Sequence, residues 1–183
     1  MPDDIKAAPA PTAGNDAVPS ITGLNHFAWR CRDAEETRHF YEDILGLPLV
    51  HTIALDHVPS TGEYSPYMHL FFRMTDGSCI AFFDLGDGGT YKPDPGTPLW
   101  VNHFAMEVAD YDDVLAFAKR LKDHGIEHIG PTDHGFIRSI YFFDPNNLRL
   151  EITCSMATET ESAAYEDRAH AHLQQWLADH KKG

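Results

Sequence analysis

The sequence predicts an α+β fold made of two similar βαβββ modules and a C-terminal helix. The motif NHFA at residues 25–28 recurs at residues 102–105, an offset of 77 positions. Inside each repeat the hydrophobic pattern changes from strand-like to helix-like and back to strand-like. Agreement at one offset indicates an internal duplication, with modules at about residues 21–84 and 99–154.

The first module opens with the apolar segment GLNHFAWRC, which is typical of a buried strand. Asp33 is a natural helix N-cap, and Glu36 three residues later completes a capping-box pattern. Gly46 should end the helix. Three further strands are predicted, at about residues 49–55, 67–74 and 78–84.

The second module repeats this order. The segment LWVNHFAMEV predicts its first strand, and either Asp110 or Asp112 caps the helix that follows. Gly125 should stop this helix. The remaining strands are predicted at about residues 126–130, 136–143 and 148–154.

The segments outside the modules differ in character. Residues 86–98 are rich in Gly and Pro and predict a linker. Residues 1–20 are rich in Ala, Pro and small polar residues, so we expect a flexible N-terminal arm before a domain at 21–154. Residues 155–183 should form an amphipathic helix, which packs on the body or a second subunit or else acts as a lid.

The composition argues against some partners. A formal net charge of −14 repels nucleic-acid phosphates and anionic membrane surfaces, so we expect neither nucleic acid nor a membrane as a partner. Residues 1–20 lack the basic and apolar segments of a signal peptide, and the three cysteines form no CxxC pair. These features favour a cytoplasmic location.

Three residues have the side chains and spacing of metal ligands. His26 and His103 occupy the same position in the two repeated strands, so a pseudo-twofold arrangement directs both imidazoles toward the axis. Glu151 follows the turn 144–147, in which Asn147 tolerates a left-handed conformation. Two imidazoles and one carboxylate leave coordination positions free, as in non-haem Fe(II) sites. The alternative is that the histidines are core residues and Glu151 is a surface carboxylate.

The paired modules, the histidine in the first strand of each and the segment DPNNLRLE near the end of the second resemble the vicinal oxygen chelate superfamily. This superfamily includes glyoxalase I, fosfomycin-resistance transferases, methylmalonyl-CoA epimerase, bleomycin-resistance proteins and extradiol dioxygenases. The resemblance covers residues 21–154 and implies a pair of half-barrels with the metal in the cleft between the sheets. It does not fix the reaction, because one fold hosts many chemistries.

The resemblance also bears on the number of metal ligands. Glyoxalase I and the epimerase have a fourth ligand in the last strand of the first module, where this chain has Ala81, and Asp84 should face the opposite side of that strand. The pattern His, His, Glu is instead shared by extradiol dioxygenases, which use Fe(II), and fosfomycin transferases, which use Mn(II). A three-ligand site is therefore favoured.

Candidate catalytic residues follow from the similarity to extradiol dioxygenases. Tyr141 lies ten residues before Glu151, the spacing at which those enzymes have a tyrosine that hydrogen-bonds the substrate. His134 resembles the active-site histidine that precedes this tyrosine, at a different spacing. The acid–base histidine of two-domain enzymes corresponds to about Ser78, so His69 on the preceding strand is a candidate replacement. An ordinary structural role is the alternative for each of the three candidates.

Three functions remain open at this point. The first is an Fe(II)-dependent extradiol dioxygenase that cleaves a catechol-type aromatic substrate with dioxygen. The second is a non-redox glyoxalase, transferase or isomerase that uses Mn(II), Zn(II) or Ni(II). The third is a small-molecule-binding resistance protein. Proteins with this resemblance commonly form dimers, and the apolar face of the C-terminal helix suits a homodimer interface.

Overall fold

The computed structural model describes residues 18–180, so the predicted N-terminal arm lies almost entirely outside the described residues. The first module contains β1 (His26–Cys31), α1 (Ala34–Arg38), a π-helical segment (His39–Ile44), β2 (Leu49–His57), β3 (Tyr64–Arg73) and β4 (Cys79–Asp84). The second contains β5 (Phe104–Glu107), α2 (Tyr111–Asp123), β6 (His128–Asp133), β7 (Ile137–Phe143) and β8 (Arg149–Ser155). The helix α3 (Glu159–Asp179) follows. The predicted α+β fold of two βαβββ modules and a C-terminal helix is confirmed.

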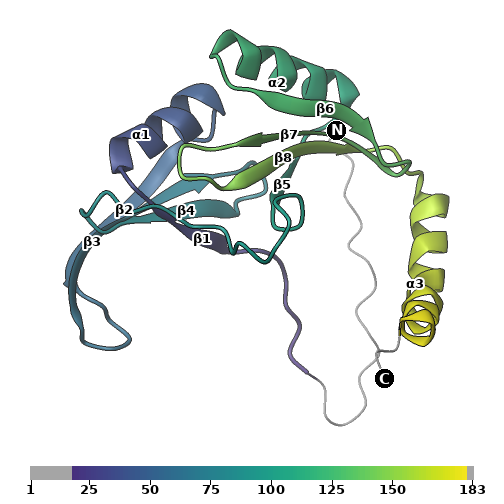
Figure 1. The fold of residues 1–183 in the computed structure, drawn as a ribbon, viewed down its shortest axis with the longest axis horizontal. Coiled ribbons are helices and arrows are strands. Elements are labelled where there is room, and N and C mark those ends of the chain that lie inside the picture. Colours follow the sequence, from purple (N-terminus) through teal and green to yellow (C-terminus); the bar gives the residue numbers. More distant parts are fainter. Residues whose placement is uncertain (1–17, 181–183) are drawn as a thin grey trace, which may run out of the picture.

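Each module forms its own four-stranded sheet. The strand orders are β1-β4-β3-β2 and β5-β8-β7-β6, and the first strand of each module is parallel to the last. The helices α1 and α2 lie on the same outer side of the two sheets (Figure 1). This arrangement leaves one face of each sheet directed away from α1 and α2.

The two modules meet at a pair of equivalent residues. Phe27 and Phe104 correspond under the 77-residue repeat, and their rings stack with centroids 4.9 Å apart. A contact between equivalent residues marks the pseudo-twofold axis, which passes between β1 and β5. These strands are not hydrogen-bonded to each other, so side chains join the sheets there.

The caps of the module helices largely follow the sequence prediction. Asp33 caps α1 and Asp110, rather than Asp112, caps α2, each by accepting a hydrogen bond from the backbone N–H three residues later. The expected capping box at Glu36 is only half formed, because the Glu36 carboxylate pairs with Arg32 instead. An arginine one turn away offers a carboxylate two charge-assisted hydrogen bonds, which are stronger than one bond to a backbone N–H.

Positive φ angles occur where the sequence predicts them. Gly46 and Gly125 end the two module helices with φ values of 77° and 72°. Asn147 has a φ of 65°, which confirms the predicted left-handed residue in the turn before β8.

The hydrophobic core is shared by both modules. Tyr41 is fully buried and packs against Phe72 and Phe82 of the first sheet. Its hydroxyl donates a hydrogen bond to Asp144 in the turn between β7 and β8, over 3.0 Å. This bond joins the π-helical segment to the turn that precedes β8 and Glu151.

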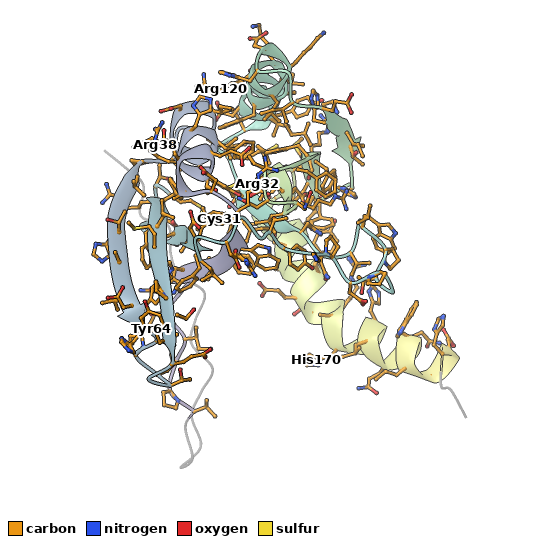
Figure 2. All side chains as sticks on the ribbon, turned by 60° about the vertical axis from the view of Figure 1, so that its left-hand side comes forward. Cys31, Arg32, Arg38, Tyr64, Arg120 and His170 are labelled. Atoms are coloured by element: carbon orange, nitrogen blue, oxygen red, sulfur yellow. The ribbon has the colours of Figure 1, made fainter. Side chains whose placement is uncertain are left out.

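The C-terminal helix α3 is separate from this core. No residue of α3 is buried, and the apolar face that the sequence predicted is exposed: 45 % for Tyr165, 52 % for Leu173, 60 % for Trp176 and 47 % for Leu177. Figure 2 shows α3 extending away from both sheets. Packing of the whole helix against the body, one of the expected arrangements, is therefore wrong for the single chain.

None of the helices within residues 18–180 combines the length and the apolar character that a membrane crossing requires.

Candidate metal centre

Glu151 lies at the centre of a set of polar side chains on the open face of the second sheet. It pairs with Ala105 of β5 on one side and with Tyr141 of β7 on the other. Because side chains alternate between the faces of a strand, Glu151, Tyr141 and His103 project from the same face. Glu151 is 2 % exposed. Its Oε2 lies 3.0 Å from His103 Nε2, and its Oε1 accepts a hydrogen bond from the Tyr141 hydroxyl over 3.2 Å.

The second nitrogen of His103 is fixed by the backbone. Nδ1 lies 3.1 Å from the carbonyl oxygen of Val101, a contact that places the proton on Nδ1. Nε2 is then available to bind a metal or, when protonated, to pair with Glu151. Metal-bound histidines commonly have this arrangement, because a carbonyl partner orients the ring and sets its tautomer. His103 and Glu151 thus fit a metal site both in donor type and in orientation.

Tyr141 connects Glu151 to His134. The Tyr141 hydroxyl lies 2.8 Å from His134 Nε2, so the structure brings two predicted catalytic residues together beside a predicted ligand. Partial burial raises the pKa of Tyr141, and the negative charge of Glu151 raises it further. The phenol is therefore protonated at neutral pH and can donate a hydrogen bond.

His26, the third predicted ligand, lies on β1 of the other sheet. It is exposed, its Nδ1 is 2.6 Å from the side-chain oxygen of Asn25, and its ring is 5.4 Å from that of Phe71. Within the described part of the chain, no three His, Cys, Asp or Glu side chains lie close enough together to hold a metal ion. The structure brings two of the three predicted ligands into contact, and His26 remains apart from them, at the equivalent position of the other module.

His69 belongs to the surroundings of His26 rather than to those of Tyr141. It is 7 % exposed, stacks on Phe83 at 3.7 Å and lies 6.1 Å from the ring of His26. Its Nε2 has no hydrogen-bond partner in residues 18–180. Burial, together with the smaller effect of the neighbouring His26 and His51, lowers the pKa of His69 to about 4. His69 is thus a neutral imidazole at physiological pH.

A fourth ligand from the first module is not available. Ala81 is fully buried, and Asp84 accepts hydrogen bonds from the backbone N–H groups of Ala34 and Gly86, both over 2.8 Å. These contacts hold Asp84 at the start of α1, away from His26, as the alternation of strand side chains predicts.

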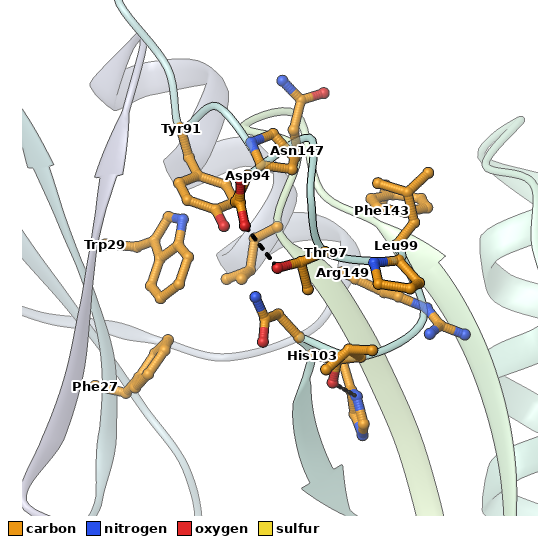
Figure 3. A pocket seen from close by; sticks show the side chains of 15 residues that line it. Phe27, Trp29, Tyr91, Asp94, Thr97, Leu99, His103, Phe143, Asn147 and Arg149 are labelled. Carbon is orange, nitrogen blue, oxygen red and sulfur yellow. Dashed lines mark hydrogen bonds between the residues drawn. The ribbon is translucent and has the colours of Figure 1, made fainter. Parts of the chain in front are cut away.

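A pocket of about 410 Å³ lies between the modules and shares only His103 with the predicted site residues. Figure 3 shows Phe27, Trp29 and Tyr91 on one side of it and His103 and Arg149 on the other. The buried Nε1 of Trp29 has no hydrogen-bond partner among the residues described. Pockets of this size and aromatic character are typical of small-molecule sites.

Sequence reasoning missed this pocket and Arg149. Much of the pocket wall comes from the segment 91–101, most of which the sequence predicts only as a linker, and nothing in a Gly- and Pro-rich segment indicates which surface it covers. The signal for Arg149 was present, because Arg149 precedes Glu151 by two residues on one strand and so shares its face.

Comparisons with known proteins identify the family of this chain. The family model described as the glyoxalase/bleomycin resistance protein/dioxygenase superfamily matches residues 23–152. A biphenyl-2,3-diol 1,2-dioxygenase from Rhodococcus globerulus is 26 % identical over 143 residues, which are 78 % of this chain and 68 % of that protein. The corresponding enzyme of Paraburkholderia xenovorans LB400 is 27 % identical over 142 residues, 76 % of this chain and 43 % of that protein.

Solved structures show the same likeness. The fosfomycin resistance protein FosX from Mesorhizobium loti superposes with a TM-score of 0.54 at 26 % identity, over 79 % of this chain and 99 % of that chain. The comparisons thus include both dioxygenases and a fosfomycin resistance protein.

Proposed function

Because the chain belongs to the glyoxalase/bleomycin resistance protein/dioxygenase superfamily, we propose that it is a metal-dependent ring-cleaving dioxygenase that acts on a catechol-type aromatic. The observation that carries this proposal is the hydrogen-bonded series His103, Glu151, Tyr141 and His134. It places a protonated phenol and an imidazole directly beside two residues suited to bind a metal. The biphenyl-diol dioxygenases among the similar proteins support the same reaction class.

His26, His103 and Glu151 would hold the metal, which is Fe(II) in this proposal. When bound, the iron supplies the open coordination positions and the redox chemistry that ring cleavage by dioxygen requires. Mn(II), Zn(II) or Ni(II) on the same ligands would belong to the non-redox alternative.

The chain's own residues would orient the substrate and move protons. The Tyr141 hydroxyl can donate a hydrogen bond to a substrate oxygen, and a protonated His134 Nε2, 2.8 Å away, can replace the tyrosine proton when that proton is transferred to the substrate oxygen. On the other sheet, His69 is the second candidate proton acceptor, but its unpartnered Nε2 is buried and its pKa is lowered to about 4, which makes it a weak base. The rings of Phe71 and Phe83 pack around His69 and exclude water from it.

Oxygen uptake by anaerobically purified, Fe(II)-loaded protein tests the reaction. We expect uptake on addition of biphenyl-2,3-diol or a simpler catechol, with a yellow ring-opened product in the visible spectrum. His103→Ala should abolish both uptake and metal binding, whereas His170→Ala, an exposed histidine on α3, should change neither.

The alternatives predict different results in the same experiment. Stoichiometric metal without oxygen uptake from any catechol would contradict the dioxygenase proposal and favour a transferase, lyase or isomerase, for which the likeness to FosX is the relevant observation. Metal-free protein that still binds small aromatic molecules would favour a resistance-type binding protein.

We also propose that the chain forms a homodimer through α3. A 21-residue helix without a buried residue exposes apolar surface that a second copy would cover. A small aromatic molecule and dioxygen are the other partners in this proposal.

A further inference from the structure

Arg149 lies inside the candidate site. It precedes Glu151 by two residues on β8 and therefore projects from the same face. Its guanidinium carbon is 4.4 Å from the centroid of the Tyr141 ring. Arg149 also lines the pocket to which His103 belongs. The guanidinium therefore contacts one predicted catalytic residue, and Arg149 lines the same aromatic pocket as one predicted ligand.

Within residues 18–180, Arg149 has no carboxylate partner and no hydrogen bond from its guanidinium. Of the other strand arginines, Arg30 pairs with Asp87 over 2.5 Å and Arg138 pairs with Asp133 over 3.0 Å. Arg73, at the exposed end of β3, forms no ion pair within residues 18–180. Arg149 differs from Arg73 because it is half-buried and lines the pocket, in a chain with 28 Asp and Glu residues that could have paired with it. The Arg149 guanidinium therefore has several coplanar N–H groups without an acceptor, and such a set of donors can bind both oxygens of a carboxylate.

The net negative charge of the molecule makes a local cation such as Arg149 important for binding an anionic substrate. A net charge of −14 repels small anions at long range, so an anionic substrate needs a local cation to bind. Among the described residues that line the pocket, the one acid is Asp94, whose carboxylate already accepts hydrogen bonds from the Gly96 backbone and the Thr97 hydroxyl. Glu151 does not line the pocket and is engaged by His103 and Tyr141. Figure 3 shows Asp94 beside Tyr91, at the other side of the pocket from Arg149.

We propose that Arg149 is the anion-binding residue of this site, and that the preferred substrate is an aromatic diol bearing a carboxylate. This inference rests on the proposed function for the diol, but it concerns a residue and a substrate group that the proposed reaction does not require. The guanidinium would bind the carboxylate while Tyr141 faces the diol. The competing explanation is that Arg149 merely packs on Tyr141.

Binding and turnover measurements separate these explanations. Calorimetry on the metal-loaded chain under anaerobic conditions would use catechol, 2,3-dihydroxybenzoate and 3,4-dihydroxybenzoate as probes. We expect at least one dihydroxybenzoate to bind more tightly than catechol, and Arg149→Met to weaken its binding about 10- to 100-fold with catechol changed less than about twofold. Arg149→Lys should restore part of the loss. Arg168→Met, which removes another guanidinium next to a tyrosine ring, should have no effect.

Two results would overturn the inference: equal weakening of catechol and dihydroxybenzoate in Arg149→Met, or no binding preference for a carboxylated probe in the wild type. Oxygen uptake distinguishes failure of the Arg149 inference from failure of the proposed dioxygenase function. A carboxylate preference that depends on Arg149, without oxygen uptake from any probe, would support the anion site and reject the dioxygenase. Oxygen uptake with catechol, without a preference for a carboxylated probe, would support the dioxygenase and reject the anion site.

Discussion

The two carboxylate oxygens of Glu151 have different neighbours, one the imidazole of His103 and the other the hydroxyl of Tyr141. No lysine or arginine lies within salt-bridge distance of Glu151 in the described residues. A buried carboxylate needs polar partners, so the His103 imidazole and the Tyr141 hydroxyl both satisfy Glu151 and fix its direction. The same contacts would orient Glu151 as a ligand.

Removing the Tyr141 hydroxyl tests this arrangement. In Tyr141→Phe, Glu151 loses one hydrogen bond and His134 loses its contact with the site, so kcat/KM should fall about 10- to 100-fold. Metal content should change little, because His103 still contacts Glu151. Steady-state oxygen uptake and metal analysis provide the measurements. Tyr111→Phe, on the helix side of the second sheet, is the matched control, and an equal loss in both variants would contradict a role specific to Tyr141.

The sequence predicted part of this site for a simple reason. Glu151, Tyr141 and His103 follow from strand periodicity, since residues of one parity share one face. The contact of His134 depends on the loop before β7, whose path has no periodic signal. The distance of His26 from the other ligands depends on how two separate sheets meet, which neither module determines alone.

At the scale of elements, the turn between β7 and β8 connects the modules. Oδ1 of Asp144 accepts hydrogen bonds from the backbone of Asn146 and Leu148, and Oδ2 accepts from the side chains of Tyr41 and Asn146. Asp144→Asn should lower the free energy of unfolding by about 1–3 kcal/mol, because an amide cannot accept at both oxygen positions. Urea unfolding measures this change. Asp112→Asn, exposed on α2, should shift it by less than about 0.5 kcal/mol.

The pH dependence of this effect has a defined sign. Burial raises the pKa of Asp144, so the folded chain binds its proton more tightly than the unfolded chain. The stability from this protonation is fully present below the unfolded pKa of about 4 and is lost as pH rises through the raised pKa. The difference in stability between wild type and Asp144→Asn should therefore narrow with rising pH. A difference that stays constant from acidic to neutral pH would contradict this assignment.

Helix and strand limits were largely predictable because caps and glycines act locally. The π-helical segment at 39–44 was not predicted, since apolar spacing over two turns does not distinguish helical pitches. The capping box of α3, formed by Thr158 and Glu161, follows the same local sequence pattern.

At the scale of the whole molecule, α3 exposes more apolar surface than a single chain can cover. The combined substitution Leu173→Glu and Trp176→Glu places two charges on its apolar face and should shift the mass in solution from a dimer to a monomer. Size-exclusion chromatography with light scattering measures this mass. Gln174→Glu, an exposed polar position on the same helix, serves as the control and should remain dimeric. A monomeric wild type, or a variant that stays dimeric, would contradict the α3 interface.

The absence of hydrogen bonds between β1 and β5 has a further consequence. His26 belongs to one half of the duplication and His103 and Glu151 to the other, so neither half carries the complete ligand set. An ion bound by all three would act as a cross-link between two sheets that otherwise touch through side chains at this boundary. Metal occupancy and the mechanical rigidity of the molecule would then be coupled, and a chelator would loosen the junction of the modules before it unfolds either one.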